Sequence, residues 1–273
     1  MAEERRIMNT WAPHYDAAAF TNAYVYRLER AQFTAWVART VRQAGHEPHT
    51  LSVLDAGCGT GDVIERLFRL GFMNLTGLDL AEGMLREARK REVVGARWVE
   101  ASIEDPPFSR DTFDVILACF TLHHLFDPQA FFRLVDLTLR PGGWFFILEL
   151  DLAPQTWRRS FPWKYKRVAG NLVRAAFARK NRRPLAPQPT VPRIYNPAHR
   201  VRGFEEIMRA IERPGRYDIR QESRGVLLPA LTSVLVEESS FDRTLARWVG
   251  AVDHWLAPRV GGVFQWVAGR RRS

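Results

Sequence analysis

Residues 53–62, VLDAGCGTGD, decide the fold of this 273-residue chain. Val53 and Leu54 close a short apolar run that predicts a strand, and Asp55 places a carboxylate at the end of that strand. Three glycines follow at alternate positions, at 57, 59 and 61, and they remove the side chains where a ligand would approach the backbone. The pattern predicts a strand, a glycine-rich turn and a helix that begins at Asp62.

Two classes of ligand use such a turn. A dinucleotide-binding turn has a third glycine three positions after the second, so that the helix offers its N-terminus to a pyrophosphate. Here that position is Asp62, and its carboxylate would repel a pyrophosphate. S-adenosylmethionine has no phosphate and carries an ammonium and a sulfonium, and Asp55 suits that positive charge.

The glycine turn resembles that of the class I S-adenosylmethionine-dependent methyltransferases. Further blocks of this family follow in order, at 75–80 (LTGLDL), 81–89 (AEGMLREAR), 113–125 (FDVILACFTLHHL) and 139–150 (LRPGGWFFILEL). The resemblance covers residues 51–150. It implies that Asp55, Gly57, Gly59, Gly61 and Leu80 bind the cofactor, and that Asp79 accepts hydrogen bonds from both ribose hydroxyls.

The order of elements predicts an α/β fold. Alternation of strands and helices over 51–150 predicts a Rossmann-like, mostly parallel seven-stranded sheet with helices on both faces. The sixth strand is expected at 217–228 and an antiparallel last strand at 261–272. We divide the chain into a helical lid (1–50), the cofactor-binding core (51–153), an insertion (154–193) and a C-terminal completion of the same domain (194–273).

The predicted third strand departs from the family at its end. Alignment of residues 98–108, WVEASIEDPPF, places Ser102 where many members have an acidic residue that accepts from the adenine amine. The same alignment places Ile103 where a backbone N–H donates to the adenine ring. Glu104 is the alternative acceptor for the adenine amine. A solvated loop is the alternative interpretation of this stretch. The backbone near Cys119 is expected to complete the cofactor site.

Candidate catalytic residues follow the fourth strand. His123 and His124 are the candidates for a general base, because a neutral imidazole titrates near physiological pH. The alternative is that they only begin the next helix. Tyr15, in the pre-sheet stretch WAPHYDAAAF, is expected to close the pocket or to face the acceptor, or else simply to pack. After the fourth strand, family members that methylate planar amines carry a motif that binds the amine, whereas residues 119–122 of this chain are CFTL. This difference argues against methylation of base amines.

Charge is concentrated in the predicted insertion. Residues 154–193 hold 11 basic and no acidic side chains, whereas the net charge is −5 before them and +4 after them. Aromatic residues are interspersed among these charges. Such a segment suits an anionic membrane surface, a nucleic-acid backbone or simply a solvated helix face. Membrane contact and the solvated face are weighted equally, and nucleic acid is weighted less.

Composition fits an intracellular enzyme. Hydrophobic residues make up 46% of the chain, and no apolar run has the length of a membrane span or signal peptide, so we expect a cytoplasmic protein and leave peripheral contact with the membrane open. Two cysteines offer neither a disulfide nor a Cys-rich metal site. The expected function is S-adenosylmethionine-dependent methylation of a small-molecule or lipid-like acceptor. An RNA methyltransferase and a non-catalytic cofactor-binding module are the alternatives.

Overall fold

The computed structural model describes residues 2–16, 24–150, 204–209, 211, 216–224 and 264–272. The predicted insertion at 154–193 lies outside these residues. Within them, no helix is both long and apolar enough to cross a membrane.

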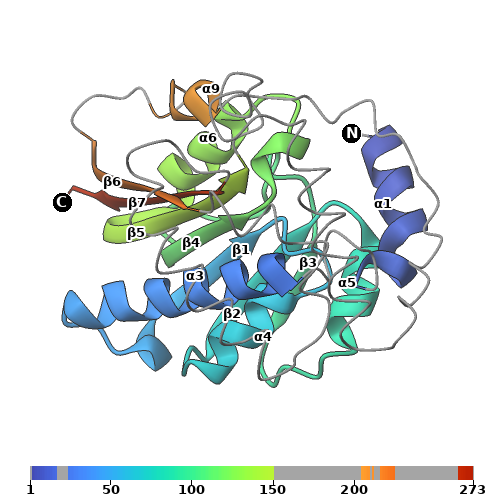
Figure 1. Ribbon diagram of the computed structural model, residues 1–273, viewed down its shortest axis with the longest axis horizontal. Helices are drawn as coiled ribbons and strands as arrows, with labels where there is room; N and C mark the ends of the chain where they lie inside the picture. The colour runs from blue at the N-terminus through green and yellow to red at the C-terminus, as the bar shows by residue number, and fades with distance from the viewer. Residues whose placement is uncertain are drawn as a thin grey trace, which may run out of the picture.

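A seven-stranded sheet forms the centre of the fold (Figure 1), in the order β3-β2-β1-β4-β5-β7-β6. Its strands are β1 (Ser52–Ala56), β2 (Asn74–Asp79), β3 (Arg97–Glu100), β4 (Phe113–Cys119), β5 (Leu139–Leu150), β6 (Tyr217–Arg224) and β7 (Phe264–Arg271). β7 pairs antiparallel with both of its neighbours, and the other pairs are parallel. The predicted α/β sheet with one antiparallel last strand is confirmed.

Two hydrophobic layers cover the sheet. Helices α3 (Tyr24–Gln43) and α4 (Asp62–Arg69) pack on one face, and α6 (Gln129–Thr138) and α9 (Phe204–Arg209) pack on the other. The alternation within β5 explains the division, because Trp144, Phe146 and Leu148 face α3 while Phe145 and Ile147 face α6. Helices therefore cover both faces, as the sequence predicts.

The first helix, α1 (Ala2–Tyr15), lies beside α5 (Glu82–Arg89) near the β3 edge of the sheet (Figure 1). Its apolar side buries Ala12 against Ala81 and Met84. The Asn9 side chain accepts a 2.6 Å hydrogen bond from the backbone N–H of Gly83. These contacts hold α1 against the carboxyl end of the sheet, where ligands of open α/β sheets bind.

Candidate active site

The turn after β1 requires its glycines. Gly57, Gly59 and Gly61 all have positive φ, at 81°, 51° and 80°. A Cβ on Gly57 would lie 2.3 Å from Cγ2 of Thr121, and one on Gly61 would lie 2.8 Å from the Trp98 ring. A Cβ on Gly59 would meet none of the described residues within 4 Å. Gly57 and Gly61 thus permit close packing, whereas Gly59 borders open space.

Asp79 ties this turn to the end of β2. Its two carboxylate oxygens accept hydrogen bonds from the backbone N–H groups of Gly59 (2.8 Å) and Ala81 (2.9 Å). Burial raises the pKa of Asp79 to about 6, and these hydrogen bonds oppose the rise. Because a carboxylate oxygen has more than one acceptor position, Asp79 can still accept from a ligand.

Asp55, at the end of β1, is an ionisable group of the site whose hydrogen-bonding capacity is unsatisfied. It is 1% exposed, and neither carboxylate oxygen has a hydrogen-bond partner among the described residues. Burial, and then the nearby carboxylates of Asp79 and Asp62, raise its pKa to about 8. A buried acceptor without a partner is unfavourable, so this position suits a cationic hydrogen-bond donor from a ligand.

A cavity of about 430 Å³ opens where these groups meet, at the carboxyl ends of β1, β2 and β4. Ten of the predicted site residues line it, namely Tyr15, Asp55, Gly57, Gly59, Asp79, Leu80, Ser102, Ile103, Cys119 and His124. Gly61 and His123 do not belong to its lining. The structure therefore brings most of the predicted site together and separates the two histidines.

Ser102 and Ile103 lie in the cavity wall beyond β3. The Ser102 hydroxyl accepts a 3.0 Å hydrogen bond from the backbone N–H of Glu104, which folds the loop into a tight turn. Ile103 is largely buried, and the Glu104 side chain also borders the cavity. The loop therefore brings Ser102, Ile103 and Glu104 to one side of the cavity.

The end of β4 forms the opposite wall. Cys119 borders the cavity, and burial raises the pKa of its thiol, so the side chain is a neutral thiol. Phe120 follows with φ of 54°, a left-handed conformation that costs a bulky residue about 1–3 kcal/mol. Its ring packs edge-on against Tyr26 at 5.6 Å and also lies against Phe264. The next residue, Thr121, donates to the carbonyl oxygens of Gly57 and Cys119.

His123 points away from the cavity toward a buried carboxylate. Its Nδ1 lies 2.7 Å from Oε1 of Glu149, a fully buried residue near the end of β5. Burial alone would lower the pKa of His123, but the charge and hydrogen bond of Glu149 raise it overall. Burial would raise the pKa of Glu149, and His123 lowers it below its ordinary value. The two groups form a buried ion pair.

His124 borders the cavity and contacts the N-terminal helix. Its Nδ1 lies 3.0 Å from Oε1 of Glu4 in α1. Burial, and then the adjacent His123, lower the pKa of His124, while Glu4 opposes that change. The two imidazole rings lie 4.2 Å apart within the 3₁₀ helix η2 (Leu122–His124). His124 is therefore neutral near pH 7.

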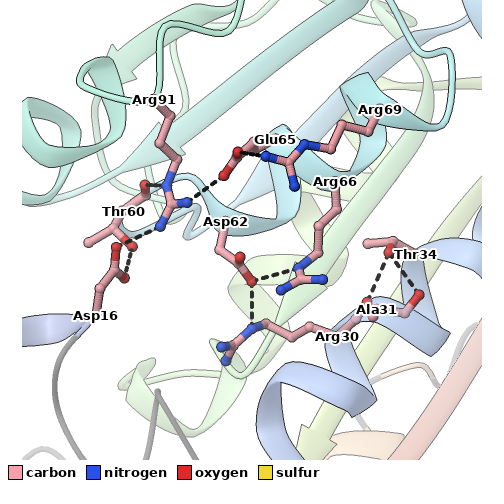
Figure 2. A network of polar contacts seen from close by, with 10 residues as sticks. All are labelled: Asp16, Arg30, Ala31, Thr34, Thr60, Asp62, Glu65, Arg66, Arg69 and Arg91. Atoms are coloured by element: carbon pink, nitrogen blue, oxygen red, sulfur yellow. Dashed lines mark hydrogen bonds and ion pairs between the residues drawn. The ribbon is translucent and has the colours of Figure 1, made fainter. Parts of the chain in front are cut away.

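A network of ion pairs surrounds the outside of the glycine turn (Figure 2). Asp62 binds Arg30 of α3 at 2.7 Å and Arg66 of α4 at 2.9 Å, and these two cations hold the pKa of Asp62 below its usual value although burial would raise it. Arg91 reaches Glu65 at 2.5 Å and Asp16 at 2.6 Å. The network links the turn to the segment that follows α1.

Tyr15, at the end of α1, borders the cavity and packs near Ala81 and Met84. Burial raises the pKa of its hydroxyl to about 12, so the phenol stays protonated in the neutral range. Among the described residues, no group of three or more His, Cys, Asp or Glu side chains is arranged to hold a metal ion.

Glu4 and Glu149 are site residues that sequence reasoning missed. Glu149 carries a signal that was available, because a charged residue inside the apolar run WFFILEL must be buried and therefore needs a partner. Glu4 carries no comparable signal, since it lies in a polar stretch 120 residues from His124.

The described residues fit S-adenosylmethionine. Asp55 offers a buried acceptor to an ammonium, and Asp79 retains acceptor positions for ribose hydroxyls. The clear space beside Gly59 allows a ligand to approach the backbone.

Comparisons with known proteins agree with this geometry. Residues 54–147 match the family model of a methyltransferase domain. The ubiquinone/menaquinone biosynthesis C-methyltransferase of Roseobacter denitrificans is 34% identical over 136 residues, which are 48% of this chain and 51% of that protein. A ubiquinone biosynthesis O-methyltransferase of Methylobacterium nodulans is 31% identical over 160 residues, which are 55% of this chain and 62% of that protein. The chain spans about half the length of the curated relatives it matches.

The fold also recurs in solved structures. An S-adenosylmethionine-dependent methyltransferase of Thermotoga maritima superposes with a TM-score of 0.59 at 17% identity, covering 98% of this chain and all of that chain. The match at residues 54–147 shows a methyltransferase domain, and the superposition shows that the chain has the fold of this S-adenosylmethionine-dependent methyltransferase.

Proposed function

We propose that this protein transfers a methyl group from S-adenosylmethionine to a small-molecule or lipid-like acceptor. The observation that carries the proposal is the buried Asp55 carboxylate, which has no described partner and borders the cavity at the strand ends. An uncompensated buried carboxylate costs stability, and an ammonium from a ligand would offset that cost.

The cofactor would be held mainly by strand ends and the glycine turn. Asp55 would bind the ammonium, Asp79 would bind the ribose, and the loop at Ser102 and Ile103 would border the adenine. When bound, S-adenosylmethionine supplies an electrophilic methyl group: the acceptor's electron pair forms the new bond to carbon, and the pair of the broken C–S bond stays on sulfur.

His124 is the residue we assign to proton removal. It borders the cavity and its pKa is lowered, so its neutral imidazole can take the proton that an oxygen, nitrogen or activated carbon acceptor loses. His123 is engaged by Glu149 instead, which supports a role in holding the loop. A proton moving from the acceptor to His124 balances the charge of the reaction.

The cavity favours an apolar acceptor. Its lining includes Met8, Phe120, Leu125 and Phe126, and Phe126 is 70% exposed. A large exposed aromatic residue at the rim of a cavity suits an apolar chain that enters there. Two of the relatives are named for ubiquinone or menaquinone biosynthesis, and a polyprenylated hydroquinone is therefore the acceptor we would try first.

The test measures transfer of a radiolabelled methyl group from S-adenosylmethionine to a polyprenylated hydroquinone. We expect His124→Ala to reduce kcat at least 100-fold, the lower end of the range for general-base catalysis, and wild-type turnover to fall as the pH drops through the lowered pKa of His124. His123→Ala should keep more activity than His124→Ala. Equal turnover by His124→Ala and wild type would refute the assignment of the base.

The RNA methyltransferase remains an alternative without support from the described residues. Six acidic residues border the cavity against two basic ones, Arg5 and Arg30, and such a mainly acidic lining does not attract a phosphate backbone. Contact of the basic segment 154–193 with an anionic membrane stays a prediction. Sedimentation with anionic and neutral liposomes would test it.

A further inference from the structure

Glu4 reaches the cavity from a helix that lies outside the methyltransferase core. Its side chain is 12% exposed, and its Oε1 lies 3.0 Å from Nδ1 of His124. Glu4 and His124 both border the cavity. A carboxylate on α1 therefore contacts the imidazole that we assign to proton removal.

Other contacts fix the position of α1, and Glu4 does not have to do so. Asn9 accepts from the N–H of Gly83, and Ala12 packs on Ala81 and Met84. Beyond the helix, Asp16 binds Arg91 at 2.6 Å and accepts from the hydroxyl of Thr60 (Figure 2). These contacts are independent of His124, so they determine where Glu4 lies.

The second nearby carboxylate is already engaged. Oε1 of Glu149 contacts Nδ1 of His123 and accepts from the backbone N–H of Leu150. Oε2 accepts from the backbone N–H groups of Leu122 and His123. Glu149 thus holds the backbone of η2, whereas a carboxylate oxygen of Glu4 lies 3.0 Å from Nδ1 of His124.

We propose that Glu4 is a positioning residue for His124, so that docking of α1 completes the proton-accepting site. This inference rests on the proposed function, because it concerns the same base. With Nδ1–H donating to Glu4, the electron pair of Nε2 is the one available to the acceptor proton. After that proton moves to Nε2, the Glu4 carboxylate stabilises the imidazolium. The arrangement links the base to the docked state of the N-terminal helix.

The first test needs no acceptor. Nitrogen-15 NMR of the full chain, saturated with S-adenosylhomocysteine, reports the tautomer and the pKa of His124. Among the described residues, His123, Glu4 and Glu149 shift the pKa of His124, and Arg5 borders the same cavity. In the wild type we expect the Nδ1–H tautomer. In Glu4→Ala we expect a shift toward the Nε2–H tautomer, which an imidazole without this acceptor favours.

Two further variants make the result specific. Glu4→Gln has the same shape without the charge, and the pKa of His124 should fall in both Glu4 variants because a neighbouring anion is lost. Glu3→Ala is the matched control, since Glu3 is the adjacent carboxylate of α1 and pairs with Arg6 on the exposed side. It should change neither the tautomer nor the pKa. An unchanged His124 tautomer and pKa in Glu4→Ala would overturn the proposal.

Turnover then separates this inference from the proposed function. With the hydroquinone acceptor, Glu4→Ala should lower kcat about tenfold or more at an unchanged KM for S-adenosylmethionine. A shifted tautomer with unchanged kcat would overturn the positioning role. Absence of methyl transfer by the wild type would count against the proposed function, while the NMR measurement would still decide whether Glu4 orients His124.

Discussion

The turn after β1 and the loop after β4 border the same cavity, but they are held in different ways. The turn is built from glycines with positive φ, and its anchor is the strand-end residue Asp79. The loop is held by side chains from distant elements, since Glu149 comes from β5 and Glu4 from α1. The turn thus depends on backbone conformation, whereas the loop depends on contacts made by side chains that are distant in the sequence.

Removing Glu149 should disrupt the loop after β4 and leave the glycine turn intact. Glu149→Ala leaves the backbone N–H groups of Leu122, His123 and Leu150 without their acceptor and leaves His123 without its buried partner. We expect the free energy of unfolding to fall by about 3–5 kcal/mol. Urea denaturation at pH 7 measures this change. Glu82→Ala, which removes an exposed pair with Arg89, should cost less than about 1 kcal/mol.

The pH dependence of this pair follows from its pKa shifts. Because the pKa of Glu149 is lowered in the folded state, ionised Glu149 stabilises the fold fully above pH 4.5, its unfolded-state pKa. This stabilisation is lost as the pH falls through the folded-state pKa. Because the pKa of His123 is raised in the folded state, protonated His123 stabilises the fold fully below pH 6.5, its unfolded-state pKa. This stabilisation is lost as the pH rises through the folded-state pKa. If the free energies of unfolding of the wild type and Glu149→Ala differed by the same amount at every pH from 3 to 9, the ion pair would be contradicted.

Gly57 is where the two regions touch, so its substitution should damage both. Gly57→Ala places a Cβ 2.3 Å from Thr121 at a φ of 81°, and we expect a loss of about 2–4 kcal/mol in the free energy of unfolding. Gly59→Ala should cost about 1 kcal/mol, because its Cβ meets no described residue and φ is 51°. Thermal unfolding of both variants would test this ranking.

A second substitution sharpens the test. Thr121→Ala removes the two side-chain atoms closest to the new Cβ, Cγ2 and Oγ1. The double variant with Gly57→Ala should therefore recover part of the lost stability, which a double-mutant cycle measures. If the stability changes of the two single substitutions were strictly additive, the contact between Gly57→Ala and Thr121 would not be the cause of the stability lost in Gly57→Ala.

Substitution of Asp55, unlike the substitutions above, should stabilise the cofactor-free protein. The pKa of Asp55 is raised from 3.8 to about 8, so its ionisation makes the cofactor-free protein progressively less stable as the pH rises from 3.8 to 8. Asp55→Asn should raise the melting temperature at pH 8 by at least roughly 2–4 °C, equivalent to about 1 kcal/mol, and leave it unchanged near pH 4. The same variant should bind S-adenosylmethionine at least tenfold more weakly, because a charge-assisted hydrogen bond is lost. Lower stability at pH 8 would contradict this account.

The elements that could be predicted from sequence are those with local signals. Apolar runs locate β1, β4 and β5, the alternation at 263–268 locates β7, and the glycines fix the turn at which Asp55 and Asp79 meet. Parallel strands then bring their carboxyl ends to one edge of the sheet, which is why ten of the predicted residues border one cavity.

The division between His123 and His124 could not be predicted in the same way. Adjacent residues in a 3₁₀ helix point in different directions, and their partners Glu149 and Glu4 lie 26 and 120 residues away in the chain. Without the register of β5 and the docking of α1, nothing in the stretch TLHHL distinguishes one histidine from the other. The roles of the two histidines therefore depend on tertiary contacts.

Calorimetric titration of the full chain with S-adenosylmethionine and S-adenosylhomocysteine tests the central claim most directly. We predict micromolar binding of both ligands, at least tenfold weaker binding by Asp79→Ala because hydrogen bonds to a carboxylate are lost, and unchanged binding by Asp218→Ala, which removes an exposed ion pair on β6. Absence of binding by the wild type, or equal affinity in Asp79→Ala, would contradict the assignment of the cavity to this cofactor.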